Sequence, residues 1–382
     1  MASTYLTRTI TSSGNNKILT NSVWVKRGSL GAQALNQYNG DPGTLNYVDV
    51  LEFNSSNQLR FFVNRLGTLE IDYVTNRVFR DTSAWYHIVL AVDTTQVTAS
   101  DRVKMYVNGV QETSFATSTA PSLDFTNQFN NVDSVISPGV QYSTGFNQKY
   151  FDGSMAHFHA IDGTAYDASA FGATNAASGI WTPLASPSVT YGTNGFFLKF
   201  ASSGALGTDS SGNSNTFTVN GPGTQTQDAP SNVFATWNPL IFYNNRTTTN
   251  GNTTFTNTAT NWTSGFSTLS ASQGKYYVEI KPIAGSYNYF GIINSDDIYQ
   301  GGALNDGLGG ASIGQPAAIY NSFNGNKTIN TVSTSFGATF TSGDIIGMAV
   351  DLDNLKIYWS KNSAWQGGGD PTAGTGGITI TG

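Results

Sequence analysis

The sequence contains no cysteine and few charged residues. The absence of cysteine among 382 residues excludes disulfides, thiol catalysis and cysteine metal ligands. Charged residues make up 11% of the chain, against roughly 25% in an average globular protein. Helical bundles depend on Glu, Lys, Arg, Ala and Leu, so this composition argues against them. The net charge of −6 argues against a general nucleic-acid-binding protein, which needs a basic face.

Long hydrophobic runs are also missing. The longest apolar stretch, Trp85–Val92, has eight residues and includes a histidine, so we expect no membrane-spanning segment. The start of the sequence, Met1–Thr4, lacks the apolar stretch of a signal peptide, so we expect none.

Aromatic residues, glycine and small polar residues are abundant instead. The chain is 13% aromatic and contains 42 glycines. A disordered chain has high net charge and few aromatics, so we expect this chain to fold. Asn, Thr, Ser and Gly take the place of the missing charge, and these residues suit turns and strands.

The periodicity predicts strands almost everywhere. Val103, Met105 and Val107 alternate with polar residues, which is typical of a half-buried strand. The Asn108-Gly109 pair that follows favours a type I′ hairpin turn, because both residues tolerate positive φ. The one short helix candidate is Asp167–Phe171. The fold class is therefore predicted to be all-β.

Composition also suggests where domains begin and end. The stretch from Pro183 to Pro239 is rich in proline and turn residues, yet it includes strand-like segments. We predict two antiparallel β-sandwich domains of the jelly-roll type joined by a Pro/Gly-rich connector. Their bounds are 1–223 for the first domain with a C-terminal β appendix, 224–240 for the connector and 241–382 for the second domain.

Four segments in the first 165 residues carry a resemblance to a known family. They are Ser22–Lys26, Ala84–Val89, Val103–Gly109 and Phe151–Ala156. Together they resemble the laminin-G/concanavalin-like lectin family, and the last is similar to that family's closing strand motif Phe-x-Gly-x-Ile-Ala. The resemblance implies a jelly roll of two antiparallel sheets.

A second resemblance covers residues 270 to 370. Its carriers are Gly274–Glu279, Gly343–Gly347, Asp351–Asn354 and Ile357–Asn362. These residues resemble a SPRY domain, which implies another β-sandwich. SPRY domains continue with further strands where this sequence stops at Gly382, so we expect an incomplete sandwich or one that another chain completes.

The two domains in this order resemble virion appendage proteins of tailed bacteriophages, especially marine ones. The start Thr4–Thr9 and the segment Ala205–Asn213 are similar to those proteins. The resemblance implies a tail-fibre-like structural protein on the phage particle that attaches to host surface glycans or proteins. Other virion proteins are expected partners, and a homotrimer is favoured. The alternative is a head fibre, capsid decoration or tail-assembly protein that binds other virion proteins.

Glu70-Ile71-Asp72 is the best enzymatic candidate. Alternation puts Glu70 and Asp72 on one face of a strand, as in jelly-roll glucanases. Those enzymes need a third carboxylate shortly afterwards, and residues 73–76 supply none. We therefore expect a non-enzymatic protein in which this pair faces solvent.

Metal and cofactor sites have weak support. His87 lies in a buried-strand pattern and is expected to be structural, whereas His157 and His159 share a strand face that alone does not make a zinc site. Relatives of the resembled family often bind calcium through loop carboxylates. Four aspartates beside turns leave calcium open and unassigned: Asp93, Asp101, Asp351 and Asp353. No cofactor is expected.

Aromatic residues near loops are the remaining functional signal. Sugar rings stack on Trp and Tyr through their C–H faces, so exposed aromatics are candidate glycan contacts. We predict a ligand-binding set in the second domain, with Trp365 as its most exposed member. The set consists of Tyr287, Tyr289, Tyr299, Asn362 and Trp365.

Overall fold

The computed structural model describes residues 4–176, 179–241, 246–257, 263–285, 287–294 and 317–380. It divides into two compact units. Unit 1 comprises Met1–Pro239 and Thr249–Thr254, and unit 2 comprises Leu240–Thr248 and Phe255–Gly382. The described part is all-β, with two short 3₁₀ segments, η1 (Ala99–Asp101) and η2 (Ala168–Ala170). Among these residues no helix is long and apolar enough to cross a bilayer.

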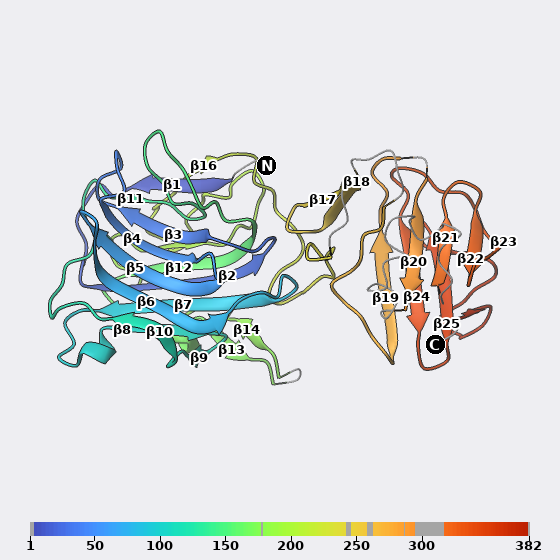
Figure 1. Ribbon diagram of the computed structural model, residues 1–382, viewed down its shortest axis with the longest axis horizontal. Helices are drawn as coiled ribbons and strands as arrows, with labels where there is room; N and C mark the ends of the chain where they lie inside the picture. Colours follow the sequence, from blue (N-terminus) through green and yellow to red (C-terminus); the bar gives the residue numbers. More distant parts are fainter. Residues whose placement is uncertain are drawn as a thin grey trace. The chain divides into compact units, whose positions relative to one another are not determined.

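Unit 1 is a sandwich of an eight-stranded and a six-stranded antiparallel sheet (Figure 1). The eight-stranded sheet contains, in order, β10 (Phe115–Thr119), β6 (Thr68–Val78), β5 (Gln58–Arg65), β4 (Tyr47–Phe53), β3 (Gln33–Asn39), β11 (Val135–Ile136), β1 (Tyr5–Thr9) and β16 (Thr218–Asn220). The six-stranded sheet contains β15 (Phe196–Leu198), β12 (Gly153–Asp162), β2 (Ile18–Arg27), β7 (Trp85–Asp93), β8 (Val103–Val107) and β9 (Val110–Gln111). A small separate sheet pairs β13 (Gly172–Thr174) with β14 (Trp181–Pro183).

Alternating apolar residues build the core between the two large sheets. Leu51 and Phe61 come from one sheet, Val23 and Ile88 come from the other, and all four are buried in one cluster. The alternation read in β8 is confirmed, because Val103, Met105 and Val107 all join this core. The Asn108-Gly109 turn is confirmed as well, with φ values of 49° and 83°.

Unit 2 contains a five-stranded and a four-stranded sheet that share a second core. The five-stranded sheet contains β19 (Lys275–Ile280), β24 (Ile346–Asp351), β25 (Lys356–Lys361), β26 (Ala364–Trp365) and β27 (Ile378–Thr379). The four-stranded sheet contains β20 (Tyr289–Ile293), β21 (Ala317–Asn321), β22 (Asn326–Ile329) and β23 (Val332–Ser335). Met348 and Trp359 of one sheet pack with Ala318 and Tyr320 of the other. A two-stranded sheet pairs β17 (Arg246–Thr249) with β18 (Thr254–Asn257).

The segment expected to be a connector differs from the prediction. Residues 224–239 belong to unit 1, where Asp228 forms an ion pair with Lys26 of β2. Both side chains are only 2% exposed. The proline and turn content of this segment therefore marks an irregular layer packed on the sandwich. The helix candidate Asp167–Phe171 becomes η2, capped by the Asp167 side chain, which accepts a hydrogen bond from the Ser169 amide.

Candidate functional site

The two carboxylates of β6 do not form an acid–base pair. Arg60 of β5 holds Asp72 with two hydrogen bonds, Nε to Oδ1 at 2.7 Å and Nη2 to Oδ2 at 3.0 Å. This bidentate ion pair uses both oxygens of the carboxylate. Glu70 is exposed and lies where the register between β5 and β6 shifts. The arrangement gives Asp72 a structural role in joining two strands.

His87 of β7 is buried, and its ring is surrounded by two tryptophan rings and a serine hydroxyl. Its ring stacks on Trp24 at 4.6 Å between centroids, and its Nδ1 accepts a hydrogen bond from Trp181 Nε1 at 3.0 Å. Because an indole N–H can only donate, the neutral ring carries its proton on Nε2, which donates to Ser22 Oγ at 2.9 Å. This tautomer cannot take a proton from Ser22, so the pair is not an activated nucleophile. Burial lowers the pKa of His87 to about 3.

The other two histidines lie on the same sheet face, on β12. His159 stacks on Phe197 at 3.8 Å, and its Nδ1 lies 2.9 Å from the hydroxyl of Tyr191. His157 has a φ of 46° at an irregularity in the strand pairing. Burial lowers the pKa of both rings. His159 is buried, His157 is half-buried, and both rings pack against Phe197. Among the described residues, no carboxylates join them in a group that could hold a metal.

The aspartates considered for calcium are dispersed. Asp93 accepts hydrogen bonds from Thr95 and Gln96, Asp101 pairs with Lys104, and Asp351 pairs with Lys275. Asp353 accepts a hydrogen bond from the Gly274 amide. In the described part of the chain, no three side chains of His, Asp or Glu gather as a metal site.

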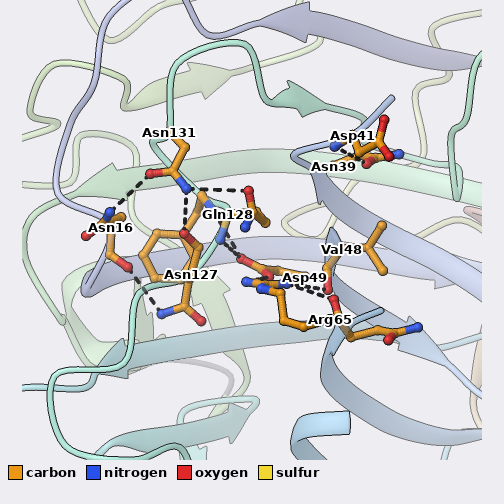
Figure 2. Close-up of polar contacts among 11 residues, drawn as sticks. Asn16, Asn39, Asp41, Val48, Asp49, Arg65, Asn127, Gln128 and Asn131 are labelled. Atoms are coloured by element: carbon orange, nitrogen blue, oxygen red, sulfur yellow. Dashed lines mark hydrogen bonds and ion pairs between the residues drawn. The ribbon is translucent and has the colours of Figure 1, made fainter. Parts of the chain in front are cut away.

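Loop amides at one end of unit 1 hold each other (Figure 2). Buried Asp49 forms an ion pair with Arg65 at 2.9 Å and accepts hydrogen bonds from the amides of Gln128 and Phe129. Burial raises the pKa of Asp49. Beside it, three asparagine side chains donate hydrogen bonds in turn. Asn16 donates to the side-chain oxygen of Asn131, Asn131 to the backbone carbonyl of Asn127, and Asn127 to the backbone carbonyl of Asn16. These polar side chains therefore help to fix the loop around residues 127–131.

Trp365 and Asn362 lie on one hairpin of unit 2. Asn362 has a φ of 48° in the turn between β25 and β26. Its amide oxygen accepts a hydrogen bond from the Ile345 amide, and its nitrogen donates to Asp344 Oδ1 at 2.8 Å. Both the oxygen and the nitrogen of the Asn362 side-chain amide therefore already form hydrogen bonds within unit 2. The expectation that Trp365 is the most exposed member of the set is wrong. Trp365 is half-buried because its ring contacts Tyr277 and Tyr358 edge to face, whereas Tyr287 is 54% exposed.

The predicted tyrosines do not join that hairpin. Tyr287 is exposed, and its ring lies 4.9 Å from the exposed ring of Phe323. Tyr289 is half-buried at the start of β20 opposite Asn321, and burial raises the pKa of its hydroxyl. Tyr299 lies outside the described residues.

The outward face of the five-stranded sheet presents an aromatic corner. Directly opposite residues in neighbouring antiparallel strands share a face, and the registers align Glu279, Gly347, Ser360 and Trp365 in one row. Tyr277 lies two residues before Glu279 on β19, so it projects from that face too. The Tyr277 and Trp365 rings lie 6.2 Å apart at 66°. We call these two rings and Glu279 the aromatic corner.

Hydrogen bonding fixes the corner. The Tyr277 hydroxyl donates to Glu279 Oε1 at 2.9 Å. Partial burial and this carboxylate raise the pKa of Tyr277, so the hydroxyl stays protonated. Tyr277 is 54% exposed. The corner thus offers an exposed ring, a second ring nearly perpendicular to it and a carboxylate acceptor.

Comparison with known proteins identifies the fold of the first half. Residues 2–170 match the laminin G-type profile of the concanavalin A-like lectin/glucanases superfamily. This matched region is similar to the concanavalin A-like lectins. It contributes most of unit 1, and β15, β16 and the segment 224–239 lie beyond it.

Several solved structures are similar to the chain at low identity. A heptameric SAP-like pentraxin from Limulus polyphemus is 10% identical, with 43% of this chain and 72% of that chain covered and a TM-score of 0.33. The CBM40 of the Ruminococcus gnavus IT-sialidase is 15% identical, with 43% and 94% covered and a TM-score of 0.29. Domains LG4-5 of mouse laminin α1 are 8% identical, with 99% and 78% covered and a TM-score of 0.34. Scores this low carry no functional conclusion.

Sequence reasoning selected Trp365 as a candidate but left out the residues that lie beside it. Tyr277 was assigned to a strand and left out of the binding set. The alternation in Lys275–Ile280 nevertheless places its side chain on the opposite face of the strand from Val278. Val278 packs toward the core, so Tyr277 has to face outward. The strand register that brings Trp365 beside it joins segments far apart in sequence, and no local pattern contains that information.

Gly347 provides a test of the corner. A Cβ at this position would meet the Tyr277 hydroxyl and the Ser360 Oγ. We expect Gly347→Ala to destabilise unit 2 by about 1–3 kcal/mol and to displace the Tyr277 ring. Chemical denaturation and the NMR shifts of Tyr277 measure both effects. Gly204→Ala, where a Cβ meets nothing within 4 Å, should change neither. An unperturbed Tyr277 in the Gly347 variant would contradict the packing described.

Proposed function

We propose that the protein is a non-enzymatic binding protein of a tailed-bacteriophage particle that attaches to host surface glycans through its SPRY-like second unit. The aromatic corner of Tyr277, Glu279 and Trp365 is the observation that carries this proposal. A sugar ring can stack its C–H face on an exposed aromatic ring. Glu279 can accept a hydrogen bond from a sugar hydroxyl.

Low charge supports this mode of recognition. With 11% charged residues the protein has little long-range electrostatic steering, so short-range stacking and hydrogen bonding dominate. Single sites of this kind bind weakly. We propose that a homotrimer on the particle converts weak sites into tight attachment through multivalency.

The virion assignment is supported by the resemblance of the sequence to phage appendage proteins. In the alternative, a head fibre, capsid decoration or tail-assembly protein, the same corner would contact other virion proteins. Cryo-electron microscopy of the particle distinguishes them, because a distal tail position agrees with host attachment and a capsid position favours the alternative.

Removing the two rings tests glycan binding. We expect Tyr277→Ala with Trp365→Ala to weaken retention on a host-glycan array by about tenfold or more, because stacking of about 1.5 kcal/mol is lost. Tyr276→Ala is the matched control. Tyr276 is 53% exposed, nearly the same as Tyr277, but it projects from the opposite face of β19. Equal losses in both variants, or no loss in the first, would argue against the corner.

Catalysis is tested separately. The Asp72–Arg60 ion pair leaves β6 without a free acid and base, so we expect no oligosaccharides to be released from host glycan by the purified protein. Release that persists in repeated preparations and disappears with Asp72→Asn would make the protein a depolymerase.

A further inference from the structure

A groove of about 390 Å³ lies within unit 1, outside the lectin domain matched by sequence. Its volume falls in the usual range of small-molecule sites, roughly 300–1,000 Å³. Most of its lining residues are threonine, glutamine or asparagine, and one is phenylalanine. The lining residues are Thr224, Gln225, Thr226, Gln227, Asp228, Phe234, Asn250 and Thr253.

The single charged residue of the lining is already neutralised. Asp228 Oδ2 pairs with Lys26 Nζ at 2.8 Å, and both side chains are 2% exposed. Asp228 Oδ1 accepts hydrogen bonds from Trp85 Nε1 and from the Phe234 amide, each at 3.1 Å. Both oxygens of the Asp228 carboxylate therefore already have partners within unit 1. A ligand in the groove therefore meets no free charge among the lining residues.

Hydrogen bonds hold the backbone of Phe234 in place. Its backbone amide donates to Asp228, and its carbonyl accepts a hydrogen bond from Lys26 Nζ at 3.3 Å. The side chain remains 41% exposed although the backbone is fixed at both ends by a buried ion pair. Because the backbone of Phe234 is already ordered, a ligand that stacks on its ring need not order the backbone as well.

Polar groups beside the ring are available. Gln227 is exposed, and its side chain makes no hydrogen bond to any residue that the structure describes. Gln225 Nε2 donates to the Phe200 carbonyl and Asn250 Nδ2 to Thr254, which leaves their amide oxygens as acceptors. Amides of this kind donate to and accept from sugar hydroxyls.

We propose that this groove binds a neutral saccharide, which stacks on Phe234 and exchanges hydrogen bonds with Gln227. The neutral lining selects against anionic sugars, because a carboxylate in the groove would find no cation to pair with. The inference rests on the proposed function as a glycan-binding protein, but it names a second site on a different unit and the class of its ligand. Two sites on each chain would double the contacts available for multivalent attachment.

The test uses the full chain in the Tyr277→Ala, Trp365→Ala background, so that binding at the aromatic corner does not mask the groove. The probes are an array of neutral oligosaccharides of glucose, galactose and N-acetylglucosamine, with glucuronic acid and sialic acid oligosaccharides as the anionic set. We expect residual neutral-sugar binding that Phe234→Ala weakens about tenfold. Phe234→Tyr should restore it.

The control is Val233→Ala, an adjacent residue that is 55% exposed and outside the lining. Thermal unfolding of each variant shows whether the fold is intact. If Phe234→Ala has no effect while the aromatic corner binds glycans in the parent protein, the groove proposal fails and the proposed function stands. Preference for the anionic set would overturn the ligand class. If neither site binds any sugar, both proposals fail.

Discussion

Replacing Lys26 by methionine is expected to lower the free energy of unfolding of unit 1 by about 3–5 kcal/mol. The substitution leaves the Asp228 carboxylate buried without its cation, held only by the N–H groups of Trp85 and Phe234. Removing one partner of a buried pair is costly because the remaining charge cannot return to water without moving the segment that carries it. Urea unfolding followed by tryptophan fluorescence measures the change.

The same substitution at an exposed pair serves as the control. Lys17 pairs with Asp124 at 2.9 Å, but the two side chains are 36% and 58% exposed. Lys17→Met should therefore cost less than about 1 kcal/mol. A Lys26→Met, Asp228→Leu double variant should recover much of the loss, since no lone charge remains buried. If Lys26→Met costs no more than Lys17→Met, the ion pair does not anchor residues 224–239.

This ion pair also explains why residues 224–239 pack on unit 1 although their composition predicts a connector. Composition suggested a connector at 224–240, because proline and turn residues look alike in a linker and in an irregular packed layer. Lys26 and Asp228 are 202 positions apart. No local pattern links them, and only the folded sheet brings β2 beneath the segment.

Local chemistry was sufficient where neighbours in sequence decide the structure. The alternation of Val103, Met105 and Val107 fixed both the strand and its buried face, and Asn108-Gly109 fixed the turn. The all-β class is confirmed for the same reason, and the profile match over residues 2–170 supports the resemblance to concanavalin A-like lectins. Each depends on short-range periodicity and on ordered strand motifs.

The candidate site depended on contacts that sequence does not encode locally. Asn362 was selected because it sits in a loop, but the same loop uses its amide to hold Asp344 and Ile345. Trp365 meets Tyr277 only because β24 and β25 lie between their strands. Exposure and partners of a polar or aromatic side chain are properties of the register, which is set by the whole sheet.

Unit 1 is expected to lose stability as the pH falls from about 7 to 5. The chain has three histidines, at positions 87, 157 and 159, and burial lowers the pKa of all three in the native state. In the unfolded chain they titrate near 6.5. Below that pH the histidines are protonated in the unfolded state but stay neutral in the native state. The free energy of unfolding therefore decreases as the pH falls.

The pKa of His87 sets the expected size of this loss of stability. With a native pKa of about 3, this ring alone should cost about 2 kcal/mol at pH 5 relative to pH 8, and His157 and His159 act in the same direction. The raised pKa of Asp49 opposes them, because its native carboxyl takes up a proton more readily than the unfolded one. His87→Gln isolates the histidine contribution by removing one titrating ring.

Unit 2 provides the internal reference, since none of the three histidines lies in it. Hydrogen bonds from Thr341 and Asn362 lower the pKa of Asp344 to about 2, so that group stays charged throughout this window. Hydrogen-exchange mass spectrometry at pH 7 and pH 5, corrected for intrinsic exchange rates, reports each unit separately. Protection should fall in the core strands of unit 1 and hold in unit 2. At pH 7 the His87→Gln variant should be less stable than the parent protein, because Trp181 and Ser22 lose their hydrogen-bond partner. Its stability should also depend less on pH. An unchanged pH dependence in that variant would show that His87 is protonated in the native state at pH 5.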